Sequence, residues 1–341
     1  MKKKLFYVLL GLGVFISLDS CSTGESAAAA ASRMFGGSSQ ALLFLNCRAV
    51  LEDEIEFVFS QPVTVKSISF EPSISVISVE NGSTVRVKLE APQSPGKQIT
   101  ADLLAEDESR NTINVLVPFR TRNNRMPSLI INEVCTEYSN PRTEFIEFKT
   151  LTAGNLGGMR VFIHGNTNAA RETVYEFLPV EVKAGEYIVL HLRTVEATTK
   201  DEYGEDLAES GGRNASPTAR DFWIPGNSKL VHRAATAIYV LNQDDMVLDA
   251  IMISETADPW WTKDYFAEAA EFLFSQGAWK TMDEKIAGPA DAIRSTGSTN
   301  TRTICRNETV ENSKTAADWY VTVTSGLSPG RPNNPNRFAS N

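Results

Sequence analysis

Short runs in which apolar and polar residues alternate restrict the fold of this chain more than any other sequence feature. Residues 55–59 alternate before Gln61-Pro62, residues 84–89 alternate throughout, and residues 115–119 repeat the pattern. A period of two is typical of a β-strand with one buried and one solvated face. Asn81-Gly82 separates two such runs and predicts a tight hairpin. We therefore expect an all-β fold, with a break in the strand at Gln61-Pro62.

The alternating runs divide into two consecutive units. Residues 41–126 contain strands short enough, and turns frequent enough, for an antiparallel β-sandwich. This first unit resembles a bacterial Ig-like domain of the kind found in surface-layer and adhesin-type proteins, which implies a spacer or a binding module. The segments that carry the resemblance are residues 56–63, 107–111 and 119–121.

A different pattern begins after Met126-Pro127 and continues to residue 336. It contains an Ile-Asn-Glu strand, a Glu-Phe-Ile-Glu strand, a Gly-rich turn, an Ala-Gly-Glu-Tyr turn, a late Ser-x-x-Arg strand, a Trp and a closing Pro-Gly-x-x-Asn. These motifs lie at residues 131–133, 144–147, 157–158, 184–187, 298–302, 319 and 329–333. In this order they resemble a lamin-tail domain, which implies a second Ig-like β-sandwich.

Two insertions interrupt the lamin-tail pattern, at residues 193–227 and 254–296. The first is polar and contains clustered acidic residues between 201 and 209. Clustered carboxylates can hold Ca²⁺, but the Asp-x-Asp-x-Asp-Gly spacing of a preformed calcium loop is absent. We therefore expect a solvated acidic loop rather than a metal site.

The second insertion predicts a helix that begins at Asp258-Pro259, with the aspartate as its N-cap. Its aromatic residues recur at helical spacing and include Trp260, Trp261, Tyr265 and Phe266. Stripes of this kind usually pack against a core, so a helix that caps the sandwich is one interpretation. The alternative is an exposed aromatic surface in which these four side chains contact a ligand.

The amino terminus has the arrangement of a bacterial lipoprotein signal. Lys2, Lys3 and Lys4 precede an apolar stretch that leads to Leu18-Asp19-Ser20-Cys21. The stretch is shorter than the roughly 20 apolar residues that span a bilayer, but it fits a removable signal peptide. We expect residues 1–20 to be removed and Cys21 to be lipidated. A plain secretory signal or a membrane helix is the alternative.

Charge and composition bear on the expected cellular location and partners of this chain. Without residues 1–20 the formal net charge changes from −9 to −11, because that segment carries three lysines and one aspartate. Residues 21–40, rich in Ala, Ser and Gly, are typical of a flexible tether. The acidic balance disfavours nucleic acid as a partner, since binding it depends on Lys and Arg that neutralise phosphates. We expect a location in the bacterial cell envelope, periplasmic or surface-exposed, with the membrane as a partner through the lipid anchor.

The sequence gives little support for a catalytic or metal-binding site. Gly326-Leu327-Ser328-Pro329-Gly330 matches a nucleophile elbow, but no histidine follows Ser328 and no helix is indicated after it. The three histidines form no zinc-binding pair, and His191 is predicted to be structural. Glu144 and Glu147 are an odd number of residues apart, which points them to opposite faces of a strand. We therefore predict no catalytic residues, no metal site and no cofactor.

Three cysteines follow Cys21, at positions 47, 135 and 305. An exported chain permits disulfides, and Cys135 and Cys305 lie in predicted strands of the second unit. The sequence leaves two interpretations open, a Cys135–Cys305 disulfide or three free thiols.

Taken together, the patterns predict a non-catalytic binding or structural lipoprotein with an unknown protein, glycan or cell-wall ligand. Two other functions stay open. One is a hydrolase, or a protein accessory to one, whose site the two insertions would form. The other is a nucleic-acid-binding envelope protein, which the acidic charge disfavours.

Overall fold

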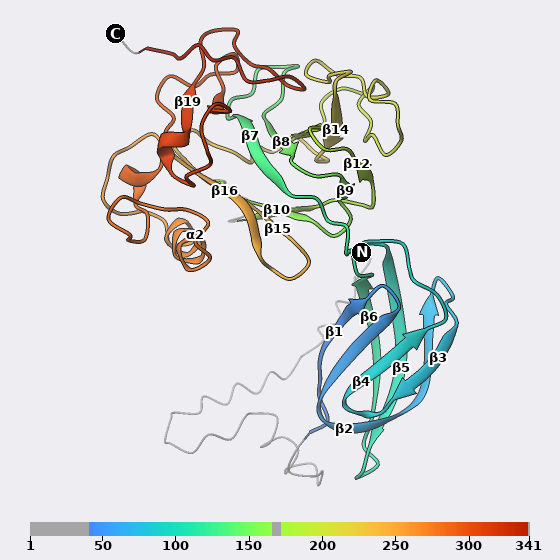
Figure 1. Ribbon diagram of the computed structural model, residues 1–341. Coiled ribbons are helices and arrows are strands. Elements are labelled where there is room, and N and C mark those ends of the chain that lie inside the picture. Colours follow the sequence, from blue (N-terminus) through green and yellow to red (C-terminus); the bar gives the residue numbers. More distant parts are fainter. Residues whose placement is uncertain (1–40, 166–171, 340–341) are drawn as a thin grey trace, which may run out of the picture.

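The computed structural model describes residues 41–165 and 172–339, and most of its regular structure is β-strand. Two groups of strands follow one another along the chain, each with its own apolar core (Figure 1). The chain is therefore all-β, as the alternation predicts. The signal peptide, Cys21 and the tether lie outside the described residues.

The first unit is one hydrogen-bonded sheet with the strand order β3-β4-β2-β5-β6, in which β1 also pairs with β2. Buried side chains from β2, β4 and β5 share one apolar cluster, so the sheet curves around its own core. The strands are β1 (Phe44–Leu51), β2 (Glu54–Glu71), β3 (Val76–Glu80), β4 (Gly82–Leu89), β5 (Gln98–Asp107) and β6 (Thr112–Arg120). β3 and β4 form the hairpin predicted at Asn81-Gly82.

The predicted strand break at Gln61-Pro62 is wrong. β2 continues through this point but changes its partners: its regular pairing with β4 is interrupted after Val58, and at Val63 it pairs with Gly82 of β4 and begins its ladder with β5. Proline has no amide hydrogen to donate to a ladder, so it is tolerated where one ladder ends and the next begins. The same strand thereby serves both halves of the curved sheet.

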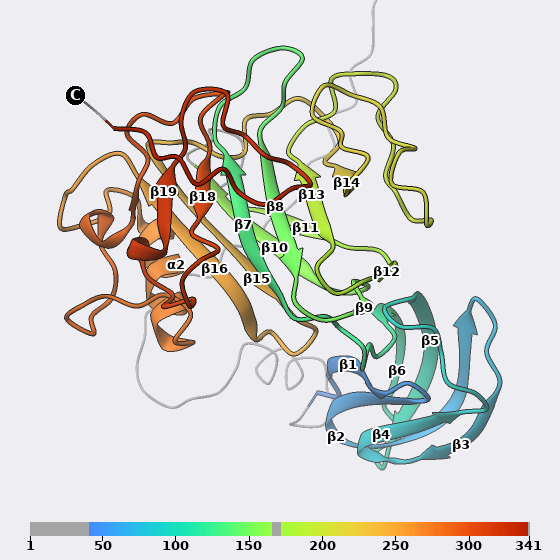
Figure 2. The same cartoon turned by 45° about the horizontal axis from the view of Figure 1, so that its top comes forward.

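The second unit contains two main sheets that face each other (Figure 2). One has the order β11-β10-β15-β16-β17, the other the order β14-β13-β8-β7-β18-β19, and β9 and β12 form a separate pair. The strands are β7 (Leu129–Cys135), β8 (Phe145–Thr150), β9 (Gly154–Asn155), β10 (Arg160–Gly165), β11 (Thr173–Glu176), β12 (Glu181–Val182), β13 (Tyr187–His191), β14 (Ala219–Trp223), β15 (Ala235–Leu241), β16 (Val247–Ser254), β17 (Ile293–Arg294), β18 (Ile304–Arg306) and β19 (Trp319–Val321).

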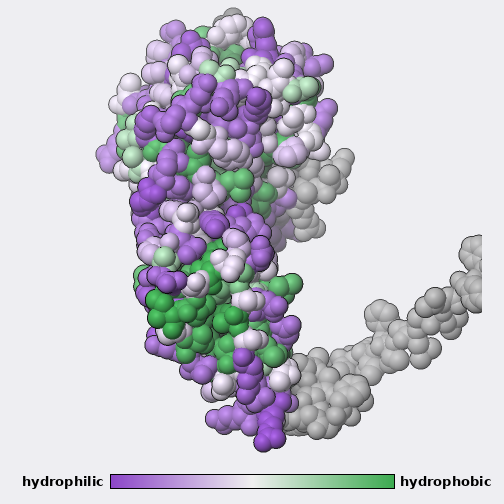
Figure 3. Space-filling model, turned by 90° about the vertical axis from the view of Figure 1, so that its right-hand side faces the viewer, coloured by the Kyte–Doolittle hydropathy of each residue, from purple (hydrophilic) through white to green (hydrophobic). Residues whose placement is uncertain are grey.

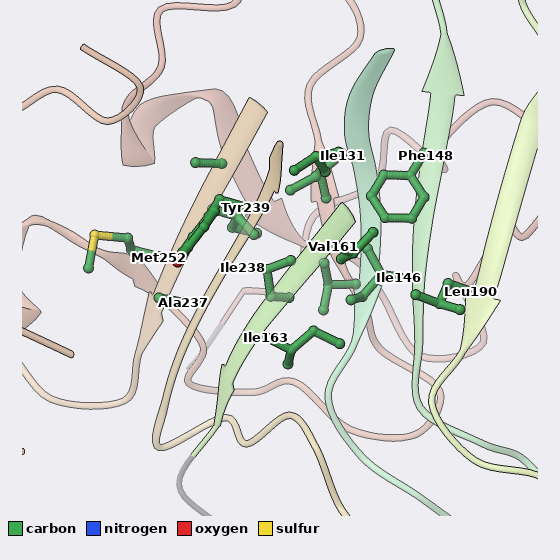
Figure 4. Close-up of a cluster of buried hydrophobic side chains, with 14 of the residues drawn as sticks. Ile131, Ile146, Phe148, Val161, Ile163, Leu190, Ala237, Ile238, Tyr239 and Met252 are labelled. Carbon is green, nitrogen blue, oxygen red and sulfur yellow. The ribbon is translucent and has the colours of Figure 1, made fainter. Parts of the chain in front are cut away.

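The main core lies between these two sheets. Ile131 and Phe148 contribute to it from one sheet, and Val161, Ile163 and Ile238 from the other (Figure 4). All five side chains are buried. At roughly 1.5–3 kcal/mol for each fully buried large apolar side chain, this layer supplies the main driving force for packing the sheets together.

The first insertion is not merely a solvated loop. It contains β14, which pairs in parallel with β13 and extends the sheet by one strand. Glu202, one of the clustered acidic residues, is buried and accepts hydrogen bonds from the backbone amides of Asp221 and Ser210. These two hydrogen bonds hold the loop against β14. The Glu202 carboxylate is therefore bonded to the backbone and not to solvent.

The second insertion contains the helix α2 (Asp264–Ser275), which packs on β10 and β15. The predicted start at Asp258-Pro259 is wrong, because the helix begins at Asp264 with Lys263 as its N-cap. The Asp258 carbonyl instead accepts a hydrogen bond from the amide of Ala290, which holds that segment outside the helix. Within the described ranges, no helix combines the length and hydropathy that a membrane span requires.

The two units meet at a tightly packed joint. Arg122 binds Asp244 through two hydrogen bonds of 2.6 and 2.8 Å, and the amide of Asn123 donates to Oε1 of Gln243 at 2.8 Å. Gly96 has a φ of 65°, and a Cβ there would lie 2.4 Å from the backbone of Gly157 in the other unit. Only glycine fits this contact, so the joint fixes how the units sit against each other.

Candidate functional site: the buried polar face of the second unit

The outer face of the β7–β8 sheet carries polar residues where alternation predicts solvent. Glu133 on β7 lies directly opposite Glu147 on β8. In the same register, Glu147 faces Val189 and Glu133 faces Cys305, so a row of side chains crosses the sheet. Both glutamates are 0% exposed. Something other than the core must therefore cover this face.

The cover is the carboxy-terminal segment 323–338, which we call the flap. It leaves β19 after Val321, crosses the sheet and returns, so that the amide of Phe338 donates to the Val321 carbonyl. At its far point Gly330 lies against Ser216 and Ala219, next to β14. Figure 2 shows this dark red segment running across the ends of β7, β8 and β13.

The flap supplies most of the hydrogen bonds to the two carboxyl groups. Ser328 donates to Glu133 from its amide, at 3.1 and 3.2 Å, and from its hydroxyl, at 3.0 Å. The amide of Gly330 donates to Glu147 at 2.7 Å. The sheet adds Asn132 to Glu147 and Thr303 to Glu133. Ser328, the centre of the Gly-x-Ser-x-Gly match, thus binds a carboxylate.

Burial dominates the electrostatics of this pair. Desolvation raises the pKa of Glu133, and it raises the pKa of Glu147 well above its ordinary value, with repulsion from Glu133 as the second cause. The pKa of the Cys305 thiol is also raised, by burial and by Glu133. The nearest ammonium on the same strand, Lys149, is paired with Glu308 at 2.5 Å.

A second polar cluster lies at the β13–β14 side of the same face. Nε2 of His191 is 2.8 Å from Asp221, and its Nδ1 is 3.3 Å from the hydroxyl of Thr143. The imidazole stacks on Trp223 with ring centroids 3.7 Å apart. This order of groups resembles a hydroxyl–imidazole–carboxylate relay, but Thr143, His191 and Asp221 are at most 1% exposed. All three side chains are therefore enclosed within the second unit and hydrogen-bonded to one another.

Glu144 and Glu147 have different partners, which fits their predicted opposite orientations. Glu144 is bound by the guanidinium of Arg193, which also lies 4.1 Å from the ring of Tyr138. Asp249 on β16 forms a comparable buried pair with Arg306 on β18 and so links the two sheets. Such pairs are costly to break, because the remaining partner keeps an uncompensated charge.

The four aromatic residues of the second insertion do not form one exposed surface. Trp260 is 80% exposed, whereas Phe266 is buried in the main core. Trp261 and Tyr265 are partly buried and contact Phe266, and the indole of Trp261 donates to the Ala287 carbonyl at 2.8 Å. The structure thus leaves Trp260 as the exposed member of the set.

Cys135 and Cys305 are free thiols, so the structure does not contain the disulfide between them that the sequence left open. The register places Cys305 opposite Glu133, two residues away from Cys135. Diagonal neighbours of this kind have side chains about 7 Å apart, beyond the roughly 4 Å between Cβ atoms that a disulfide needs. Cys47 is also free, and burial raises the pKa of its thiol and that of Cys135 to about 12.

Other parts of the surface are weaker candidates for a functional site. A hollow of about 450 Å³ at the end of the first unit includes Glu106, Asp107 and Arg110 in its lining. Asp107 already accepts hydrogen bonds from Gln61 and Asn111, both at 2.7 Å. Apolar surface gathers elsewhere on this unit (Figure 3). In the described part of the chain, no group of three or more His, Cys, Asp or Glu side chains is placed to hold a metal ion.

Sequence reasoning missed the Glu133–Glu147 pair. The available signal was the glutamate in each of two neighbouring strands, Ile131-Asn132-Glu133 and Glu144-Phe145-Ile146-Glu147. An antiparallel pairing of these strands can bring the two carboxyl groups together. The burial of the pair depends on residues almost 200 positions later, which no local pattern reveals.

Fold and site together define an all-β protein with two units, the second of which has a covered polar face. A family model named TP_1001_2nd and described as "protein second domain" matches residues 127–321. This range is more than half of the chain, and it begins at the Met126-Pro127 break. The chain belongs to this family.

The chain is also similar to an uncharacterized protein of Treponema pallidum (strain Nichols), with 29% identity over 199 residues. The match covers 55% of this chain and 49% of the relative, so this chain spans about half the relative's length. A solved structure, the N-terminal part of the bacterial S-layer protein SbsC, matches with 13% identity and a TM-score of 0.25. That match covers 67% of this chain and 46% of the other. So weak a likeness carries no conclusion about fold or function.

Proposed function

We propose that this protein is a lipid-anchored protein of the bacterial cell envelope that acts as a non-catalytic structural or binding module. The anchoring rests on one observation, the Leu18-Asp19-Ser20-Cys21 sequence after a short apolar stretch. Two acyl chains on the cysteine would hold the protein on a membrane stably, where one chain binds only marginally.

The non-catalytic part of the proposal is supported by how the polar groups are engaged. Glu133, Glu147, His191 and Asp221 have hydrogen-bond partners within the fold and are covered by it. The joint at Arg122 and Gly96 supports a structural role, because it holds two units at a set angle. We further propose that both units are Ig-like sandwiches and that the second is related to lamin-tail domains.

Metabolic labelling with a palmitate analogue tests the anchor. We expect label in the wild-type protein and none in Cys21→Ala, which should also leave the membrane fraction. Cys47→Ala is the matched control and should keep the label. An unlabelled wild-type protein, or label that persists in Cys21→Ala, would contradict the anchoring.

A binding role would use exposed anchors, and Trp260 is the strongest candidate among the aromatic residues. In a screen against glycans, cell-wall polymers and proteins, Trp260→Ala should weaken binding without a change in melting temperature. Trp261→Ala removes a packed ring and an indole hydrogen bond, so it should lower the melting temperature. Binding that survives Trp260→Ala would exclude this surface.

A further inference from the structure

The Glu133–Glu147 pair meets hydrogen-bond donors but no cation among the described side chains that bind it. Three of the donor groups that reach the two carboxyls belong to the flap: the amide and hydroxyl of Ser328 and the amide of Gly330. The others are Asn132, Thr303 and the thiol of Cys305. The flap therefore excludes water from the two carboxyl groups. It also donates hydrogen bonds in place of those that water would make.

Two carboxyl groups in this position resist simultaneous ionisation. Residues directly opposite in an antiparallel pair have Cβ atoms about 5 Å apart, and both side chains here are fully buried. Like charges at such a distance, out of water, disfavour the doubly ionised state. Movement of the flap would admit water and relieve that penalty.

We propose that the flap is a proton-linked latch, closed over the sheet while the Glu133–Glu147 pair holds a proton and loosened when the pair loses it. The inference does not depend on the lipid anchor or on any ligand.

The sign of the pH dependence follows from proton linkage. Burial raises the pKa of both glutamates while the flap is closed, and exposure to water returns them toward ordinary values. The closed state therefore binds more protons than the open state. Closure is fully favoured below the ordinary glutamate pKa and weakens as pH rises through the raised values.

Other titratable groups around the pair do not reverse this sign. Lys149 and Glu308 neutralise each other, and His191 and Asp221 are bound to each other. Arg306 binds Asp249 and the Ile131 carbonyl. Burial raises the pKa of Cys135 on β7, Cys305 on β18, Tyr320 on β19 and Tyr187 on β13, so their ionisation acts in the same direction. Arg220 on β14 is paired with Glu186, and the flap itself carries Arg331 and Arg337.

Two free thiols lie under the flap and can report its movement. Cys135 packs in a small apolar cluster with Leu327 of the flap, and Cys305 faces Glu133. They are 2% and 0% exposed. Their burial shields both thiols from an alkylating reagent while the flap is closed.

The test is alkylation of the full chain with a maleimide between about pH 6 and pH 9, followed by peptide mapping that separates Cys135 and Cys305 from Cys47. Glu147→Gln imitates the protonated state, and comparison at the same pH cancels the ionisation of the thiols themselves. At about pH 9 we expect wild-type Cys135 to react several-fold faster than Cys135 in Glu147→Gln, because only the wild-type pair can lose its proton. The ratio of the two rates should fall steadily toward one as the pH is lowered.

Glu271→Gln, an exposed glutamate on α2, is the matched control and should behave as wild type. Gly330→Ala should expose both thiols at every pH, because a Cβ there would lie 2.5 Å from Oγ of Ser216 at a φ of 75°. Equal reactivity of wild type and Glu147→Gln across the range would overturn the proposal. If Glu147→Gln does not fold, hydrogen exchange of wild-type peptides from the flap decides: protection, corrected for intrinsic rates, must fall as pH rises.

Discussion

The two units bury their charges very differently. The first buries an apolar cluster and only two carboxylates, Glu56 and Asp107, both near its surface. The second fully buries Glu133, Glu144 and Glu147 among many other polar groups. The first has bare outer strands, whereas the flap and the first insertion cover an outer face of the second. The comparison teaches that burial in the second unit is set by what lies over the sheet as much as by strand alternation.

Breaking a covered charge pair should give the largest effect. Arg193→Ala leaves Glu144, which is 0% exposed, without its guanidinium. We expect a loss of about 3–5 kcal/mol in the free energy of unfolding of the second unit. Hydrogen exchange resolved by peptide should show the loss in residues 127–339 and leave the first unit unchanged. A loss below about 1 kcal/mol would mean that water reaches Glu144.

Loosening the joint between the two units should have the next largest effect. Asn123 is buried, and its Nδ2 donates to the carbonyls of Asn155, at 2.7 Å, and Gly157, at 2.9 Å. Asn123→Ala leaves these acceptors unpaired, which should cost about 1–3 kcal/mol. Small-angle scattering should show a wider range of inter-unit orientations, while Asn114→Ala, at an exposed position on β6, should scatter as wild type. Unchanged scattering from Asn123→Ala would show that other contacts suffice.

Acid should destabilise the second unit through His164. Burial lowers its pKa to about 4, although Glu172 lies 3.1 Å from Nε2. The unfolded chain, with an ordinary histidine pKa, binds more protons, so stability is lost as pH falls from about 6.5 toward 4. At about pH 5 we expect a loss of roughly 1 kcal/mol, kept small because Glu172 beside Nε2 favours the charged imidazole. His164→Gln should flatten this slope in thermal melts, and an unchanged slope would assign it to other groups.

An exposed charge pair in the first unit should matter least. Arg48 binds Glu56 at 2.9 Å, but the arginine side chain is 64% exposed and Arg86 also binds Glu56. Arg48→Ala should therefore change the unfolding free energy by less than about 1 kcal/mol. Denaturant melts of wild type and variant should nearly superimpose. A loss as large as that of Arg193→Ala would remove the contrast between the units.

The sequence predicts the strands well and their surroundings less well. Runs such as residues 84–89 and the Asn81-Gly82 hairpin follow from local alternation and turn chemistry. The partner change at Pro62, the late start of α2 and the incorporation of β14 depend on contacts with distant segments. The burial of Glu133 and Glu147 could not be predicted locally for the same reason. Strand alternation alone predicts that an outward-facing glutamate is solvated, and the flap that covers these two comes much later in the sequence.

The strand order has a consequence for how the chain acquires its structure. The central strand β7 needs β18 as a neighbour, and the Thr303 hydroxyl that binds Glu133 is 170 residues further along the chain. Contacts this far apart in sequence are slow to form, because a long loop must close first. The second unit therefore cannot complete its sheet until nearly the whole chain is available. A chain interrupted before residue 304 would therefore lack β18, β19 and the flap, although every strand of the first unit would already be present.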